Sequence, residues 1–188
     1  YNKFCEVCEK DLDKNRFFLQ NYNTDKNYRW GYAKLLRNNT VFNREKQEML
    51  EMKRGLFIDI FPCDNVPDKF IAKKIFSLKC FWVRKNSYAP VGAKYESNKI
   101  YRLFYKILSH NSLAYIRKLY DALACQCLDE NTKRVRIVAW SSKRENEGFP
   151  RKWMEDRIEY EFEGHYFWDV RRWKTATTEL TQPLTGWK

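Results

Sequence analysis

One acidic side chain inside a strand-like run is the first candidate for chemistry in this sequence. Residues 55–61 alternate so that Asp59 shares one face of the predicted strand with Phe57 and Phe61. A carboxylate on such an apolar face is costly to bury unless a metal ion or a cation pairs with it. The pattern leaves two interpretations: a buried strand in which Asp59 holds a cation, or an edge strand in which Asp59 faces water.

The residues after this run predict where the strand ends. Pro62 has no N–H group to donate to a sheet, so we expect the strand to stop before it. Asp64 and Asn65 then predict a turn, because their side chains hydrogen-bond readily to nearby backbone groups.

Cysteine spacing offers a second, weaker candidate for chemistry. Cys5 and Cys8 have the spacing of half a zinc site, but no second pair with that spacing follows. Six cysteines in 188 residues are too few for a disulfide scaffold. Reduced, mostly buried thiols in a cytoplasmic protein are therefore the expected state.

The net charge of the chain indicates which kinds of molecule it is expected to bind. The chain has 36 Lys and Arg residues against 24 Asp and Glu residues, a net charge of +12, which favours anionic partners such as nucleotide phosphates, polyanionic glycans or acidic lipid headgroups. Nucleic acid is a weaker choice, because the basic residues are spread along the chain and no DNA- or RNA-binding motif appears. No apolar stretch reaches about 18 residues, so no membrane span is predicted.

Periodicity along the chain predicts an α+β fold in one ordinary domain. We expect a small mixed sheet built from the strands near residues 17, 33, 57 and 136, covered by helices over 69–85 and 98–128. The apolar stripes of these helices are interpreted as core. Ser112 is a candidate N-cap for a helix through Leu128.

Less regular segments predict the connections. Arg37, Asn38 and Asn39 predict a hairpin turn between strands over 32–36 and 40–43. The run 44–53 is so charged that it predicts either a solvated helix or a mobile loop. Pro90 and Gly92 predict a loop over 87–97.

Three blocks of the sequence resemble the LicD family. Residues 55–67 are similar to its signature G-(I/L)-F-I-D-I-F-P-x-D-x-V-P. Residues 18–20 and 33–40 are similar to its F-L-Q and A-K-L-R-x-x-x-T segments, and residues 148–153 and 162–164 to its late F-P-x-x-W-F and F-E-G segments. The blocks occur in family order and cover roughly residues 1 to 165.

The resemblance implies a fold and an activity. The LicD family contains phosphocholine transferases and fukutin-type sugar-phosphate transferases with a nucleotidyltransferase-like fold. By resemblance, residues 1–155 form a partial domain of that kind. The implied enzyme moves phosphocholine, or a similar phosphoalcohol, from a CDP-linked donor to a polysaccharide or glycolipid precursor, as in lipopolysaccharide or teichoic acid modification. The resemblance also implies a Mg²⁺ cofactor and a cytoplasmic protein, with peripheral association at the inner face of the membrane as a further expectation.

The resemblance also suggests the site residues. Asp59 would be the catalytic carboxylate and a metal ligand, in a cleft near Lys34 or Arg37. Lys34 and Arg37 would bind the donor phosphates, or remain solvated surface charges. Thr40 is a further polar candidate for substrate binding, and Asp64 would either line the cleft or cap its turn.

Part of the family pattern is missing. An acidic W-D-D-D-I-D loop precedes a P-R-x-D-Y-x-x-F segment in the family, and Tyr1 and Phe4 match the end of that segment. We therefore expect a fragment that lacks the acidic metal-binding loop and is inactive by itself.

The last part of the chain resembles a different family. Residues 156–188 are similar to the C-terminal R-R-I-E-L-x-F-E-G-x-R-x-W-D-L-R-R-W motif of SusD-like outer-membrane glycan-binding proteins. The occurrence of a SusD-like tail after LicD-like blocks reflects either an artefact of joining in the source sequence, a genuine recombination or a local coincidence. A cationic aromatic segment formed by Trp168, Arg171, Arg172 and Trp173 could stack on sugars or nucleobases, although packing of the two Trp residues on the core is the favoured interpretation. A glycan-binding module and a basic binding domain without chemistry are thus the alternative functions.

Overall fold

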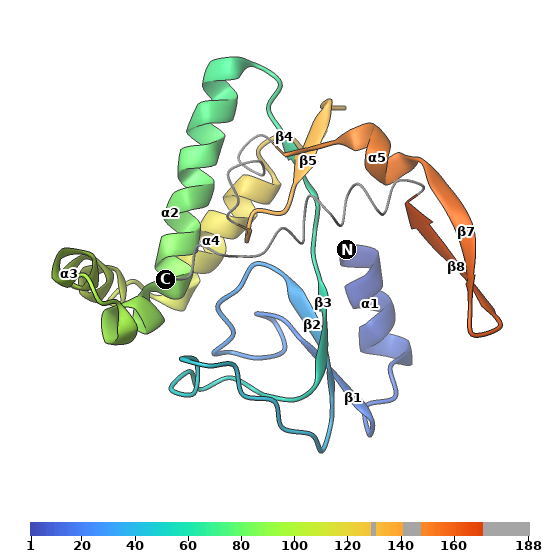
Figure 1. Cartoon of the computed structure of the whole chain (residues 1–188), viewed down its shortest axis with the longest axis horizontal. Helices are drawn as coiled ribbons and strands as arrows, with labels where there is room; N and C mark the ends of the chain where they lie inside the picture. The colour runs from blue at the N-terminus through green and yellow to red at the C-terminus, as the bar shows by residue number, and fades with distance from the viewer. Residues whose placement is uncertain (129–130, 141–147, 171–188) are drawn as a thin grey trace.

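The structure, a computed structural model, describes residues 1–128, 131–140 and 148–170. Its helices and small antiparallel sheets confirm the predicted α+β class (Figure 1). The elements are, in chain order, α1 (Asn2–Asp11), β1 (Phe17–Gln20), β2 (Ala33–Arg37), β3 (Phe57–Ile60), β4 (Asp64–Val66), α2 (Phe70–Tyr95), α3 (Lys99–Leu108), α4 (Leu113–Ala124), β5 (Arg134–Arg136), β6 (Phe149–Pro150), α5 (Arg151–Glu155), β7 (Arg157–Phe162) and β8 (His165–Val170).

The first sheet positions the candidate carboxylate. Its strands are antiparallel in the order β1-β2-β3, so β3 lies at an edge of this sheet. The edge position predicted by one of the two sequence interpretations is confirmed, but its expectation that Asp59 faces water is wrong, because that side chain is mostly covered. One face packs on α1 through Leu19 and Ala33, which contact Cys8. Asp59 lies on the opposite face, because side chains alternate along a strand.

The strand near residue 136 lies in a second sheet, so the prediction of one mixed sheet is wrong. β5 pairs with β4 and β6, and every pairing among the described strands is antiparallel. Pro62 cannot donate a ladder hydrogen bond, which separates β3 from β4 and lets β4 join a different partner. The turn predicted at Asp64 and Asn65 is also wrong, since both residues belong to β4.

The connection between β2 and β3 differs from the predicted hairpin. Residues 40–43 form no strand, and β2 pairs with β3 after an irregular connection over residues 38–56. The run 44–53 forms no helix, so that one of its two predictions is wrong, and it is an irregular loop. Asn39 begins the connection in the left-handed region, at φ 58°.

Helix α2 continues through the predicted loop at Pro90. A proline inside a helix leaves the carbonyl group four residues earlier without its usual donor. Here Arg29 supplies donors, with Nη2 3.2 Å from the carbonyl oxygen of Asn86 and Nε 2.6 Å from that of Ser87. A side chain from a distant segment therefore lets the helix run for 26 residues.

The helices pack on the second sheet with a different face from the predicted one. Phe76, Cys80 and Val83 of α2 enter the main core with Val66 and Ile116. The stripes predicted as core, which include Phe70, Leu78, Ile100 and Leu103, are exposed instead. The predicted cap of α4 is confirmed, because the Ser112 hydroxyl accepts a hydrogen bond from the backbone N–H of Tyr115.

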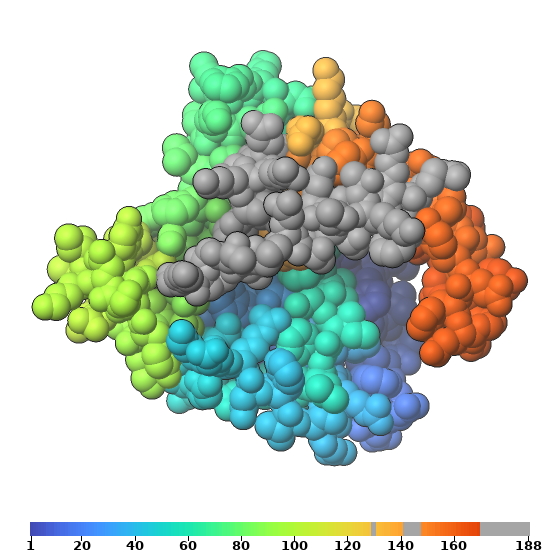
Figure 2. Space-filling model, in the orientation of Figure 1, coloured from blue at the N-terminus to red at the C-terminus, as the bar shows by residue number. Residues whose placement is uncertain are grey.

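The end of the described chain is a two-stranded hairpin, β7–β8, at the edge of the molecule (Figure 2). Trp168 is exposed there, so the expectation that it packs on the core is wrong. Arg171, Arg172 and Trp173 lie outside the described residues. Among the described residues, no helix has both the length and the apolar character needed to cross a bilayer.

Candidate functional site

A row of three polar side chains crosses the first sheet. Gln20 of β1, Lys34 of β2 and Asp59 of β3 are in register, so their side chains share one face. Lys34 is buried, with 3% of its surface exposed, and its Nζ lies 3.8 Å from Asp59 Oδ1. Arg44 reaches the same carboxylate from the 38–56 connection, with Nη2 3.3 Å from Oδ2. Asp59 is therefore held between two cations.

The ring of Phe57 makes cation–π contacts with both of these cations. Lys34 Nζ lies 3.8 Å from the ring centroid, and Arg44 Cζ lies 4.6 Å from it. Phe57 and Asp59 are two residues apart on β3 and thus point the same way, as the alternation in the sequence predicts. The strand presents an aromatic ring and a carboxylate side by side, and each attracts cations.

Burial changes the acid–base behaviour of this cluster. It lowers the pKa of Lys34 to about 8, with a further lowering by Arg44 and an opposing effect of Asp59. The pKa of the nearby Tyr32 is raised, mainly by burial and then by Asp59. An additional negative charge close to Lys34 would therefore stabilise the protonated form of its side chain.

Two oxygen acceptors near this face lack donors. Within the described part of the chain, neither Asp59 Oδ1 nor Gln47 Oε1 has a hydrogen-bond partner, although both atoms are buried. Asp59 Oδ1 is within ion-pair distance of Lys34 but beyond hydrogen-bond distance. An unpaired buried acceptor is unfavourable, so these oxygens would gain from a hydroxyl or a water molecule.

A small basic cleft lies between this sheet face and the 38–56 connection. Four cationic residues line it: Lys34, Arg44, Lys53 and Arg54. Arg54 also holds the connection in place, with Nη2 3.2 Å from the carbonyl oxygen of Leu50. The free space is about 20 Å³, which corresponds to about one water molecule. A larger group enters only if the exposed edge of the cleft moves outward.

The structure brings two of the predicted site residues together and separates the others. Lys34 and Asp59 are neighbours, as predicted, whereas Arg37 is exposed at the other end of β2. The Thr40 hydroxyl donates to the carbonyl oxygen of Arg37 at 2.6 Å and accepts from the N–H of Leu56 at 2.9 Å. Thr40 therefore joins the ends of β2 and β3, a structural role.

Asp64 belongs to a different part of the molecule. It lies in β4, in register with the buried Arg136 of β5, and burial raises its pKa to about 6. It neither lines the basic cleft nor caps a turn.

Sequence reasoning missed three of the cations in the cleft. Arg44, Lys53 and Arg54 lie in or beside the charged run for which the sequence predicts a solvated helix or a mobile loop. Charge alone does not predict that such a run folds back over a strand. The run is mixed in charge, with four basic and three acidic residues from Arg44 to Arg54, so its net charge gives no signal either.

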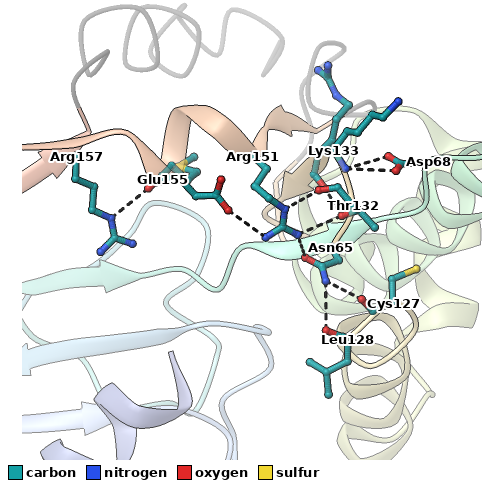
Figure 3. Close-up of polar contacts among 11 residues, drawn as sticks. Asn65, Asp68, Cys127, Leu128, Thr132, Lys133, Arg151, Glu155 and Arg157 are labelled. Atoms are coloured by element: carbon teal, nitrogen blue, oxygen red, sulfur yellow. Dashed lines mark hydrogen bonds and ion pairs between the residues drawn. The ribbon is translucent and has the colours of Figure 1, made fainter. Parts of the chain in front are cut away.

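Asn65 and Arg151 connect two of the sequence blocks (Figure 3). Arg151 Nη2 donates to Asn65 Oδ1, and Arg151 Nε donates to the carbonyl oxygen of Thr132 at 2.6 Å. Asn65 Nδ2 in turn donates to the carbonyl oxygen of Cys127 at 2.7 Å. These contacts tie the segment after Asp59 to the 148–153 block, so Asn65 and Arg151 have structural roles.

The described residues do not form a metal site by themselves. No group of three or more His, Cys, Asp or Glu side chains among them could hold a metal ion, and this includes Cys5 and Cys8. Asp59 is already paired with two cations, which would repel a divalent ion. We therefore derive no chemical step through Mg²⁺, which stays a prediction from the resemblance.

Comparison of the chain with family models, with curated proteins and with solved structures found no match in any of the three. The function of the chain is therefore inferred from its residues and their geometry.

Proposed function

We propose that this chain is a LicD-like transferase domain, and that its basic cleft binds the phosphate groups of a CDP-linked alcohol. The observation that carries the proposal is the cluster in which Asp59 holds Lys34 and Arg44 over the ring of Phe57. A cation fixed on a strand, as Lys34 is, suits phosphate oxygens, because little ordering of its side chain remains to be done on binding.

The arrangement of the three sequence blocks supports the same proposal. The 33–40 block pairs with the Asp59 strand in the first sheet, and the 18–20 block pairs with the 33–40 block on its other side. The 148–153 block contacts the 64–66 segment through Arg151 and Asn65. Two of the blocks thus lie in the same sheet as Asp59, whereas the 148–153 block contacts the strand that follows, in the second sheet.

The chemistry attributed to this chain's residues is charge neutralisation and positioning. Lys34 and Arg44 would offset the charge of the donor diphosphate, and Asp59 would keep both cations in place. Because the cleft is small, Arg44, whose side chain is 36% exposed, would move outward as the phosphate enters. The acceptor would be a cell-surface glycan precursor, met at the cytoplasmic face of the membrane.

A binding experiment with matched arginine variants tests the proposal. Isothermal titration of the full chain with CDP-choline should give a measurable affinity. Arg44→Gln should weaken binding by about tenfold, the typical effect of losing one charge-assisted contact. Arg37→Gln, an exposed arginine outside the cleft, should bind as the parent chain does.

Two results would contradict the proposal. The first is an absence of CDP-choline binding, with or without Mg²⁺, by a chain that circular dichroism shows to be folded. The second is an equal loss of affinity in both variants, because that would indicate a diffuse charge effect.

Turnover is a separate question from binding. We expect no transfer of phosphocholine by the purified chain with CDP-choline, Mg²⁺ and a glycan acceptor, because the described residues place a single carboxylate at the cleft. Turnover above background would show that the chain completes the site with other residues.

A further inference from the structure

Helix α2 carries an exposed apolar stripe opposite its buried face. The buried face of α2 includes Phe76, Cys80 and Val83. At 100° per residue, its large exposed side chains fall in one arc on the other side of the helix. These side chains are Phe70, Ile71, Ile75, Leu78, Phe81 and Trp82.

Helix α3 extends this stripe. Ile100, Leu103 and Ile107 recur at helical spacing and are exposed, Ile100 by 80%. Phe104 of α3 contacts Trp82 of α2, with ring centroids 6.5 Å apart, so the two stripes are continuous. We refer to these residues of α2 and α3 together as the helical apolar face.

Positive charge is concentrated in the same segment. Between Lys69 and Tyr120 the sequence has twelve Lys and Arg residues and one acidic residue, Glu96. This segment therefore holds nearly all of the net charge of +12, because it is poor in acidic residues, while the basic residues themselves are spread along the chain as expected. Lys74 Nζ lies 5.4 Å from the ring centroid of Phe70, and Lys85 Nζ lies 5.2 Å from that of Phe81.

Apolar surface of this extent is uncommon on a protein that has no partner for it. We propose that the helical apolar face docks on a membrane surface that contains anionic lipids. Apolar side chains would enter the boundary between headgroups and acyl chains, and the lysines beside them would contact headgroup phosphates.

Charge complementarity selects this occupant over a second copy of the chain. Two copies meeting through this face would bring two strongly basic segments together, which is unfavourable. The adjacent groove between α2 and α4, of about 380 Å³ and lined by Leu78, Trp82 and Leu119, adds apolar surface at the same place. Figure 2 shows α2 and α3 forming one flank of the molecule, which leaves them accessible.

The direct test is sedimentation of the full chain with vesicles. We expect binding to vesicles of phosphatidylcholine mixed with phosphatidylglycerol, and much weaker binding to phosphatidylcholine alone. The double variant L103S/I107S should bind the mixed vesicles at least about tenfold less tightly, since two apolar side chains no longer insert. The double variant K99Q/K106Q should lose about tenfold or more through its charge.

A matched control distinguishes binding through this face from nonspecific binding through other exposed apolar side chains. Y166S/W168S removes two exposed aromatic side chains from the β7–β8 hairpin and should bind the mixed vesicles as the parent chain does. Thermal unfolding followed by circular dichroism should show that each variant remains folded.

Three results would overturn the proposal: no binding to mixed vesicles, equal binding to both vesicle types, or an equal loss in the hairpin control. If the parent chain forms dimers but does not bind vesicles, and L103S/I107S is monomeric, the face would instead be an interface between two copies of the chain. The proposal is independent of the basic cleft, since these variants leave Lys34, Arg44 and Asp59 unchanged.

Discussion

The basic cleft and the helical apolar face invert the usual distribution of residues in opposite ways. The first sheet buries a lysine, Lys34, at 3% exposure, whereas α3 leaves an isoleucine, Ile100, at 80%. Each inversion is unfavourable by itself and needs a partner. In the cleft the partners are internal, Asp59 and the ring of Phe57, whereas the apolar face has no covering among the described residues. Substitutions that remove an internal partner should therefore lower the stability of the fold. Substitutions in a face with an external partner should instead weaken binding.

Removing the internal partner should have the largest effect. Asp59→Asn would leave Lys34 and Arg44 as neighbouring like charges, one of them buried. We expect the free energy of unfolding in urea to fall by about 2 to 3 kcal/mol at pH 7. Replacing both members in Lys34→Met/Asp59→Leu should recover most of that loss, because no buried charge then remains. A loss below about 0.5 kcal/mol would indicate that water already compensates Asp59.

The same comparison explains how much of the fold could be predicted from the sequence. Local signals were reliable: the strand at 17–20, the alternation of Phe57 and Asp59, and the Ser112 cap all depend on neighbours in sequence. Long-range contacts were not, because Pro90 stays within α2 through donors from Arg29, which lies about sixty residues earlier. No local pattern contains that information.

The candidate site shows the same difference between local and long-range signals. The Lys34–Asp59 pair followed from motif blocks that happen to be adjacent strands, but Arg44 reaches Asp59 from an irregular connection. The helical stripes were assigned to the core because periodicity reports that a helix has an apolar face. Periodicity does not report which of two apolar faces the rest of the chain covers, and α2 has one on each side.

The packing of α3 on α2 gives the next largest effect. A Cβ atom at Gly92 would lie 2.4 Å from Cδ2 of the buried Tyr105 ring, so Gly92→Ala forces the two helices apart. We expect a loss of about 1 to 2 kcal/mol in the free energy of unfolding, since overpacking exceeds the gain in helix propensity. The second-site change Tyr105→Leu should recover part of it. Full stability of Gly92→Ala would mean that the helix pair adjusts freely, and that the helical apolar face has no fixed shape.

Acid–base behaviour gives a smaller effect, specific to the cleft. With its pKa lowered to about 8, Lys34 is charged below that pH and neutral above it in the free protein. An anionic ligand favours the charged form, so affinity for CDP-choline should fall as pH rises through about 8, by up to about tenfold per unit. Titrations across this range should show the fall in the parent chain and none in Lys34→Met. An identical pH profile in the two would remove Lys34 from the phosphate site.

The smallest expected change discriminates most sharply between the two regions. If Leu103 and Ile107 were core residues, as their periodicity suggests, each substitution by Ser would cost about 2 to 5 kcal/mol. Because both side chains are exposed, we expect urea unfolding of L103S/I107S to stay within about 0.5 kcal/mol of the parent chain. Tyr105→Ala, on the buried side of the same helix, serves as the positive control and should cost about 3 kcal/mol or more. A large loss in L103S/I107S would show that the chain itself covers this face in solution, and an external partner would then not be needed to explain it.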